Sequence, residues 1–354
     1  MPNPVLTAAI DALASGQDLS AQQASEVLAE IMAGDVSETQ TAAVLIALRT
    51  KGETVEELVG LATTMRRLAT PVRVGSPTGE SHDLLDTAGT GGGRPTFNVS
   101  TTAALIAAGA GCRVAKHGNR SATGLSGSAD LLEALGVKID LQPSDVAVCI
   151  DRIGFGFMFA PAHHGATRHV VPVRKELGVR TIFNFLGPLT NPAGATRQLI
   201  GVSDPAYQDT MAGALARLGA RRALVVSSSD GLDELSTSGT TRVVELDSGE
   251  LRAYDVTPQD VGLAPAAFES VAGGTPAANA EVTRRILSGD PGPARDLAVL
   301  NAGAAILAGG RAEDLEAGVR AAEAAIDSGG AAQALTALVE LTSALSAAAG
   351  RGAA

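Results

Sequence analysis

Residues 86–102 read DTAGTGGGRPTFNVSTT, a glycine-rich loop between a strand-like apolar run and a helix-like apolar run. Four of its glycines fall in one short loop: Gly89, Gly91, Gly92 and Gly93. Glycine lets a backbone approach a phosphate closely and adopt positive φ without strain, so such a loop can direct several N–H groups at one anion. The stretch therefore predicts a strand, a phosphate-binding loop and a helix in succession.

Polar residues stand where that helix is expected to begin, before the apolar run AALIAAGAG: Asn98, Ser100, Thr101 and Thr102. A helix N-terminus carries free N–H groups and roughly half a positive charge, which favours a bound anion. A phosphorylated ligand is the expected occupant. A glycine loop alone is about equally consistent with a simple tight turn between strand and helix.

Residues 116–136, KHGNRSATGLSGSADLLEALG, favour the phosphate interpretation. A strand-like run leads into Lys116, His117, Asn119 and Arg120, and a second Gly/Ser-rich loop and a helix follow. In an open α/β sheet, ligands bind outside the carboxyl ends of the strands. We therefore expect the two loops to lie side by side at that edge of a sheet.

The composition is that of a globular protein. The 354 residues are 45% hydrophobic, and the net charge of -11 disfavours binding to nucleic acid or anionic membranes. No stretch reaches the roughly 18 uninterrupted apolar residues of a membrane span, and the N-terminus lacks a basic signal region, so we expect a cytoplasmic protein. Cys112 and Cys149 have no metal-ligand spacing.

The first 70 residues predict a helical domain. Capping boxes are expected at Ser20 with Gln23, Ser37 with Gln40 and Thr54 with Glu57, and Gly34 and Gly52 are expected to end the first two of these helices. Apolar residues recur at helical spacing after each box. Residues 70–80, rich in Pro and Gly, predict a connection.

From residue 83 onward, strand-like runs alternate with helical patterns, which predicts an α/β domain with a mostly parallel central sheet. The runs are DLLDT, RVAK, VKIDL, RQLIGVS and RALVVSS, at residues 83–87, 113–116, 137–141, 197–203 and 222–228. Residues 241–256 alternate around Asp247-Ser248-Gly249 and predict a β-hairpin. We expect a helical domain at 1–72, a helical excursion near 173–194, and an α/β domain formed by 80–172 and 195–348.

Two further segments suggest chemistry. Asp233 and Glu234 follow the strand-like run at 222–228, where adjacent carboxylates suit Mg²⁺ and a diphosphate, although a solvated loop has the same composition. Residues 154–178 gather three phenylalanines, a methionine, His163, His164 and Arg174. They could line a pocket for a flat aromatic ligand, with Arg174 facing a carboxylate, or form an ordinary core strand. We expect no metal at the two histidines, because neighbours on a strand point to opposite faces.

Taken together, these motifs resemble those of the anthranilate phosphoribosyltransferase family along nearly the whole chain. The match rests on the glycine loop with TFNVST, on KHGNR with SGSAD, on VRKELGVRTIFN with LGPLTNP, and on GLDE at residues 231–234. The resemblance implies a small helical domain plus a large α/β domain, and usually a homodimer formed through the helical domain. It also implies transfer of phosphoribosyl from phosphoribosyl pyrophosphate to the amino group of anthranilate, with Mg²⁺, in tryptophan biosynthesis.

The resemblance also implies site residues. Those for phosphoribosyl pyrophosphate are Gly89, Gly92, Gly93, Thr96, Asn98, Val99, Ser100, Thr101, Lys116, His117, Gly118, Asn119, Arg120, Thr123, Gly124 and Ser128. Those for anthranilate are Gly89, His117, Asn119 and Arg174. Two Mg²⁺ ions would be held by Ser100, Asp233 and Glu234.

The chain departs from the family pattern at two places. The family loop usually reads GTGGDG with two further residues before TFN, whereas here only Gly93, Arg94 and Pro95 intervene after GTGG. Two serines commonly follow KHGNR at the positions where Thr123 and Gly124 stand. We hypothesise that Arg94 supplies a replacement contact to phosphoribosyl pyrophosphate.

Two alternatives remain open at this point. One is a pyrimidine nucleoside phosphorylase of the same architecture, which the acidic pair Asp233 and Glu234 disfavours because phosphorolysis needs no metal-bound diphosphate. The other is a non-catalytic relative that binds nucleic acid, which the net charge of -11 disfavours.

Overall fold

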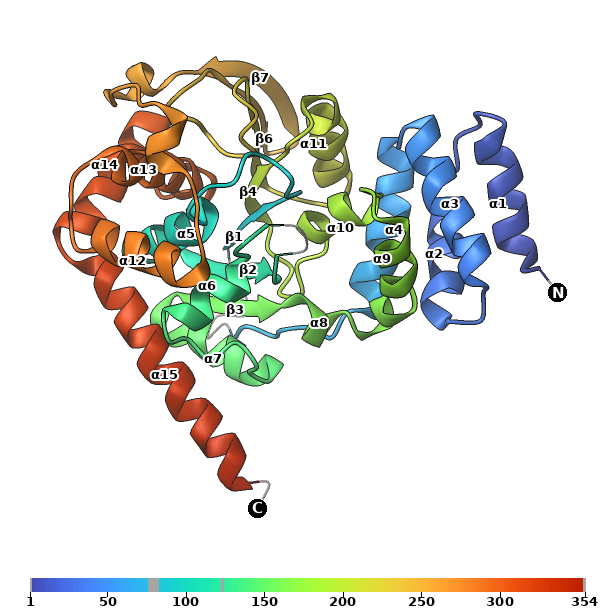
Figure 1. Ribbon diagram of the computed structural model, residues 1–354, viewed down its shortest axis with the longest axis horizontal. Coiled ribbons are helices and arrows are strands. Elements are labelled where there is room, and N and C mark those ends of the chain that lie inside the picture. The colour runs from blue at the N-terminus through green and yellow to red at the C-terminus, as the bar shows by residue number, and fades with distance from the viewer. Residues whose placement is uncertain (1, 76–82, 122–123, 353–354) are drawn as a thin grey trace.

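A computed structural model describes residues 2–75, 83–121 and 124–352, so part of the predicted connection and Thr123 lie outside the described residues. Figure 1 shows a group of N-terminal helices, in blue, beside a larger body in which helices cover a twisted sheet. The N-terminal helices are α1 (Pro4–Ala14), α2 (Ala21–Ala33), α3 (Glu38–Lys51) and α4 (Val55–Leu68).

Local capping chemistry accounts for where these helices begin. The capping boxes at Ser20 and Thr54 form as predicted. The box at Ser37 is only half formed, because the Gln40 side chain accepts the Asn3 N–H at 2.9 Å instead of returning to Ser37. Asn3 caps α1, whose start has no capping box because Leu6 stands at the third position in place of Glu or Gln.

Seven strands form one sheet in the order β3-β2-β1-β4-β5-β6-β7. The first five in this order pair in parallel, and β6 and β7 add an antiparallel hairpin at one edge. The strands are β1 (Leu84–Gly89), β2 (Arg113–Gly118), β3 (Phe155–Phe159), β4 (Arg197–Gly201), β5 (Arg222–Ser228), β6 (Thr241–Asp247) and β7 (Glu250–Val256). The predicted fold class, a small helical domain plus a larger α/β domain with a mostly parallel sheet, is confirmed.

The two faces of the sheet belong to different hydrophobic clusters, because successive strand residues point to opposite sides. Leu199 and Leu224 pack with the α/β helices, whereas their neighbours Ile200 and Val225 pack with the N-terminal helices. The remaining α-helices are α5 (Val99–Gly109), α6 (Ser128–Ala134), α7 (Pro143–Ile153), α8 (Ala160–His163), α9 (Val171–Leu177), α10 (Phe183–Leu189), α11 (Gln208–Arg217), α12 (Pro276–Leu287), α13 (Pro293–Ala308), α14 (Leu315–Asp327) and α15 (Gly330–Gly352).

Short 3₁₀ segments interrupt the loops at η1 (Gly165–His169), η2 (Pro205–Tyr207), η3 (Pro258–Val261) and η4 (Phe268–Val271). Between β3 and β4 the chain leaves the sheet, and α9 and α10 lie against the N-terminal helices (Figure 1). Polar contacts join the two parts, since Arg49 donates to the Arg180 carbonyl at 2.9 Å and Arg66 to the Leu189 carbonyl at 2.7 Å.

The strand prediction for residues 137–141 is wrong. Lys138 there donates its N–H to Thr342 in α15, at 3.2 Å, and the segment forms no ladder with any strand that the structure describes. β2 pairs with β1 on one side and with β3 on the other, and β3 is formed by residues 155–159, for which the sequence allows either a pocket wall or a core strand. Phe155, Phe157 and Met158 are buried there in the hydrophobic core, which supports the core-strand interpretation.

Helix α15 projects away from the body in Figure 1. By length and composition it is apolar enough to cross a membrane, a test that core helices of globular proteins also pass. Its first part packs against α5 and α7.

Candidate active site

The two predicted phosphate loops begin at the same edge of the sheet. β1 ends at Gly89 and its parallel neighbour β2 ends at Gly118. On the other side of β1, Gly89 pairs with Gly201, the last residue of β4, and the acidic loop at 230–234 follows β5. Four strand ends therefore bring the glycine loop, the Lys116 loop and the acidic pair to one place, as the sequence predicted.

The glycine loop lies directly on Asp233. A Cβ at position 93 would stand 2.2 Å from Asp233 Oδ1, and one at position 89 would stand 3.3 Å from Oδ2. Gly91 and Gly92 have φ of 66° and 86°, the left-handed region that favours glycine. Close approach and positive φ thus explain the glycines of this loop, including Gly93.

Lys116 links β1 to α5, the helix that follows the glycine loop. Its side chain is buried, and Nζ donates to the Thr87 carbonyl, to Thr87 Oγ1 at 3.1 Å and to Ser100 Oγ at 3.5 Å. The backbone N–H of Ser100 in turn faces the Glu234 carboxyl group. Three predicted site residues, Ser100, Lys116 and Glu234, therefore adjoin one another.

The electrostatics of this cluster favour a bound cation. Burial, followed by repulsion from Asp233, raises the pKa of Glu234 to about 8, and Lys116 opposes this rise only in part. Burial also raises the pKa of Asp233, and it lowers the pKa of Lys116. Two adjacent carboxylates that are costly to ionise together gain most from a metal ion between them.

The donor set fits Mg²⁺ in particular. It consists of oxygen atoms only, from Asp233, Glu234 and the hydroxyl of Ser100. Among the described residues, no group of three or more His, Cys, Asp or Glu side chains could hold a metal ion by itself. Magnesium usually takes one or two protein carboxylates and completes its coordination with water and substrate phosphates.

Asn98 stands at the start of α5 without capping it through its side chain. It occupies the N-cap position with φ of 67°, but its side chain makes no cap hydrogen bond. Its Nδ2 donates to the Ser126 carbonyl at 2.9 Å, and its Oδ1 accepts from Ser126 Oγ and from Asn279 Nδ2, both at 2.8 Å. Asn98 thus joins the two phosphate loops to α12 and leaves the start of α5 without a side-chain cap. Val99 and Thr101 are buried at the start of the same helix.

The second loop folds back on the end of β2. Ser128 Oγ donates to the Asn119 carbonyl at 3.2 Å and lies where a side chain at Gly118 would stand. Arg120 pairs with Asp130 at 2.8 Å and with Glu133. Gly124 donates to Ser121 Oγ at 2.7 Å. Four predicted residues of this loop therefore have defined places in it: Asn119, Arg120, Gly124 and Ser128.

A pair of buried histidines lies beside these loops. His117 Nδ1 meets the Gly187 carbonyl at 3.1 Å, and its ring centroid is 5.1 Å from that of His164. Burial lowers the pKa of His117 to about 3 and that of His164 to about 4, so both rings are neutral near pH 7. Within the described residues neither Nε2 atom has a hydrogen-bond partner, so each is a buried acceptor.

His164 was expected as a candidate pocket residue, but the strand assumed at His163 and His164 is wrong. In the structure His163 ends α8 and His164 follows it, so the alternation of a strand does not apply. Arg174 lies in α9, where its guanidinium is 5.2 Å from the Phe183 ring and burial lowers its pKa. No hydrogen bond or ion pair among the described residues links Arg174 to Asn119.

Arg94 is engaged away from the acidic pair. Its guanidinium lies 3.4 Å from the Phe268 ring centroid, and Nη1 donates to the Asp230 carbonyl at 3.5 Å. Thr96, two residues on, forms a β-bridge with Ala272. The shortened end of the glycine loop is therefore attached to the segment that contains η4.

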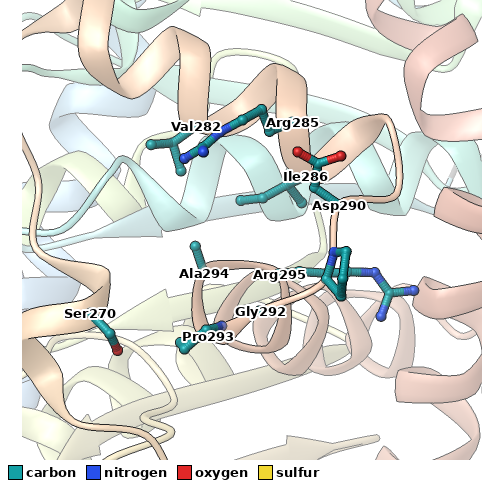
Figure 2. Close-up of a pocket in the computed structure, with 10 residues that line it drawn as sticks. Ser270, Val282, Arg285, Ile286, Asp290, Gly292, Pro293, Ala294 and Arg295 are labelled. Atoms are coloured by element: carbon teal, nitrogen blue, oxygen red, sulfur yellow. The ribbon is translucent and has the colours of Figure 1, made fainter.

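Two surface hollows are lined neither by the acidic pair nor by any of the predicted phosphate contacts. One, of about 200 Å³, lies between α12 and α13 and is lined by Arg285, Asp290 and Pro293 among others (Figure 2). The other, of about 100 Å³, lies where α3 meets the segment after α9 and includes Arg49, Arg180 and Tyr207.

Comparison with known proteins agrees with this geometry. The model for the α/β domain of a glycosyl transferase family matches residues 81–332, and the model for its helical bundle domain matches residues 7–69. Anthranilate phosphoribosyltransferase of Moorella thermoacetica is 52% identical over 88% of this chain and 91% of its own length. That of Laribacter hongkongensis is 50% identical over 96% of this chain and 98% of its own.

Solved structures give the same result. Anthranilate phosphoribosyltransferase from Thermus thermophilus has a TM-score of 0.88 at 46% identity, covering 94% of this chain and 99% of that one. The Saccharomyces cerevisiae enzyme in complex with PRPP and Mg has a TM-score of 0.86 at 29% identity, covering 96% and 98%. The chain therefore belongs to the anthranilate phosphoribosyltransferases, a family of glycosyltransferase enzymes.

Proposed function

We propose that this enzyme transfers the phosphoribosyl group of phosphoribosyl pyrophosphate to the amino group of anthranilate, as a step of tryptophan biosynthesis. The bond from C1 of the ribose to pyrophosphate breaks, a C1–N bond forms, and one amine proton is lost. The products are N-(5-phosphoribosyl)anthranilate and pyrophosphate. The observation that carries this proposal is the meeting of the glycine loop, Lys116 and the pair Asp233 and Glu234 at one edge of the sheet.

Phosphoribosyl pyrophosphate would lie on the two loops and the start of α5. The proposed contacts are Gly89, Gly92, Gly93, Thr96, Asn98, Val99, Ser100, Thr101, Lys116, His117, Gly118, Asn119, Arg120, Thr123, Gly124 and Ser128. The start of α5, which has no side-chain cap, supports this assignment, because a helix N-terminus favours a phosphate. The Saccharomyces cerevisiae relative forms a complex with PRPP and Mg.

Ser100, Asp233 and Glu234 would hold two Mg²⁺ ions, whose positive charge would offset the negative charge of the diphosphate. The buried Lys116 adds a positive charge beside Ser100. Charge grows on the leaving pyrophosphate, so preorganised N–H groups and Lys116 act most strongly in the transition state. The arylamine is a neutral nucleophile, so its position relative to C1 matters more than a strong base.

Anthranilate would lie near Gly89, His117, Asn119 and Arg174. The buried His117 and His164 rings offer acceptor nitrogens on this side of the sheet edge. Arg174 carries the positive charge that a carboxylate needs. A structure of the yeast relative is described with 4-fluoroanthranilate.

We also propose a homodimer formed through the helical domain. Apolar side chains are exposed there at Ile46 of α3, at Val171 of α9 and at Val179. Static light scattering tests this, with Ile46→Glu expected to shift the protein toward a monomer. A dimer that is unaffected by this change would place the interface elsewhere.

The reaction is tested by the loss of anthranilate fluorescence. We expect consumption that needs both phosphoribosyl pyrophosphate and Mg²⁺ and that collapses in the double variant Asp233→Ala with Glu234→Ala. The matched control is Glu250→Ala with Asp255→Ala, which removes two exposed charges from β7. No consumption by folded protein would contradict the proposal. The relatives named above are all anthranilate phosphoribosyltransferases, so the comparisons do not favour a nucleoside phosphorylase or a non-catalytic protein.

A further inference from the structure

The first half of the glycine loop is held by Ser203, two residues beyond the end of β4. Its Oγ lies 2.9 Å from the Gly91 carbonyl oxygen, and its N–H donates to Thr90 Oγ1 at 3.2 Å. Both contacts act on the part of the loop that precedes Gly92. Ser203 was not among the residues expected in the site.

Arg180 stands behind Ser203. Its Nη1 donates to Ser203 Oγ at 2.6 Å and would lie 3.1 Å from a Cβ at Gly92. Among the described residues its Nη2 is buried without a partner. Arg180 is also held from the helical side, since its carbonyl accepts from Arg49 of α3 at 2.9 Å.

The donors and acceptors in the chain from Arg180 through Ser203 to Gly91 are fixed by chemistry. Arginine only donates, so Ser203 Oγ must accept from Arg180, and its own proton is then left for the Gly91 carbonyl. In a planar trans peptide the C=O of one residue and the N–H of the next point opposite ways. Holding the Gly91 carbonyl against Ser203 therefore turns the Gly92 N–H to the other side of the loop.

The orientation needs such support, because the loop is otherwise free to change it. Gly91 and Gly92 both have positive φ, and glycine populates positive and negative φ about equally. The peptide between them can flip at little cost when nothing holds its carbonyl. A flipped peptide would present a carbonyl oxygen, which repels phosphate, in place of an N–H.

We propose that Arg180 is a positioning residue for phosphoribosyl pyrophosphate: through Ser203 it holds the Gly91–Gly92 peptide with its N–H toward the phosphate. The inference rests on the proposed function. It assigns no chemistry to Arg180 itself. Arg180 raises the fraction of molecules in which the glycine loop is oriented to bind phosphoribosyl pyrophosphate.

Steady-state kinetics with both substrates test the proposal, using Arg180→Ala and Ser203→Ala. If one tenth of the loops keep the binding orientation, the KM for phosphoribosyl pyrophosphate rises about tenfold, while kcat and the KM for anthranilate stay within about twofold. The matched control is Arg168→Ala, an exposed arginine that donates, among the described residues, only to the Gly165 carbonyl of its own turn. It should leave all three constants unchanged.

Two further variants separate positioning from general stability. The double variant should be no worse than either single variant, because both changes break the same chain of hydrogen bonds. Arg180→Lys should restore most of the affinity, since only one donor is used on Ser203. Ser203→Ala carries the test by itself if Arg180→Ala does not fold, as judged by its thermal unfolding midpoint.

Several results would overturn the inference: an unchanged KM for phosphoribosyl pyrophosphate in folded variants, an equal rise in both KM values, or additive effects in the double variant. Calorimetric titration with inorganic pyrophosphate and Mg²⁺ distinguishes this from failure of the proposed function. Wild-type protein that binds pyrophosphate but consumes no anthranilate would contradict the function only. The variants should then still bind pyrophosphate about tenfold more weakly than the wild-type protein. Equal affinities would contradict the proposed role of Arg180.

Discussion

Replacing Gly201 by alanine should disable the site by displacing the acidic loop. Gly201 ends β4 and pairs with Gly89 of the glycine loop. A Cβ there would lie 1.7 Å from the Asp233 carbonyl oxygen, whereas ordinary contact begins near 3.4 Å. The obstacle is a backbone atom, which cannot rotate away as a side chain could. The acidic loop or the end of β4 must therefore move by about 1.7 Å.

The expected effect on activity is larger than the effect on stability. Overpacking of this kind costs about 1 to 3 kcal/mol in the free energy of unfolding. A misplacement of about 1 Å in a catalytic arrangement can cost about 100-fold in rate. We therefore expect Gly201→Ala to fold, to lose at least about 100-fold in kcat/KM, and to need more Mg²⁺ for half-maximal rate.

Fluorescence assays over a range of Mg²⁺ concentrations, together with urea unfolding, check this. The matched control is Gly165→Ala, where nothing lies within 4 Å of the added Cβ and φ is not positive. It should change the free energy of unfolding by less than about 0.5 kcal/mol and leave activity intact. A folded Gly201→Ala with wild-type activity and Mg²⁺ dependence would refute the argument that Gly201 is needed to place Asp233.

Three other predictions follow from local contacts. Arg94→Ala should change the KM for phosphoribosyl pyrophosphate by less than about threefold in steady-state kinetics, because its guanidinium stacks on Phe268; a tenfold rise would restore the direct-contact hypothesis. Ser20→Ala should cost about 1 kcal/mol in urea unfolding, since it removes a complete capping box, and no loss would mean that the box contributes nothing. Burial lowers the pKa of His164 to about 4, so the unfolded chain takes up a proton there first as the pH falls below about 6.5. The free energy of unfolding should therefore drop between pH 6.5 and 4, by up to about 3 kcal/mol from this group, and His164→Gln should flatten the slope; equal slopes would contradict it.

Some errors of the sequence analysis share one cause, which is that a strand depends on its partner. Residues 137–141 alternate as a strand should, yet their backbone turns to Thr342, 204 positions away. Residues 155–159 lack any alternation and still form β3, because β2 offers them a free edge. The same cause explains the error at His163 and His164. Their side chains were expected to point to opposite faces of a strand, but no strand forms there.

The sequence alone determined the features that rest on short-range chemistry. Glycines mark the phosphate loop, capping residues mark α2 and α4, and alternating segments mark most of the sheet. Residues that follow strand ends could be placed together because parallel strands end at a common edge. The fold class and the meeting of the glycine loop with Asp233 were therefore within reach.

Only the tertiary structure decided how these groups are held. The Asn98 side chain hydrogen-bonds to Ser126 and Asn279 and does not cap α5. Arg180 contacts the glycine loop through Ser203. Their partners lie between 23 and 181 positions away in the chain. A hydrogen bond between such distant residues depends on where the whole chain packs, and local sequence patterns carry no record of that.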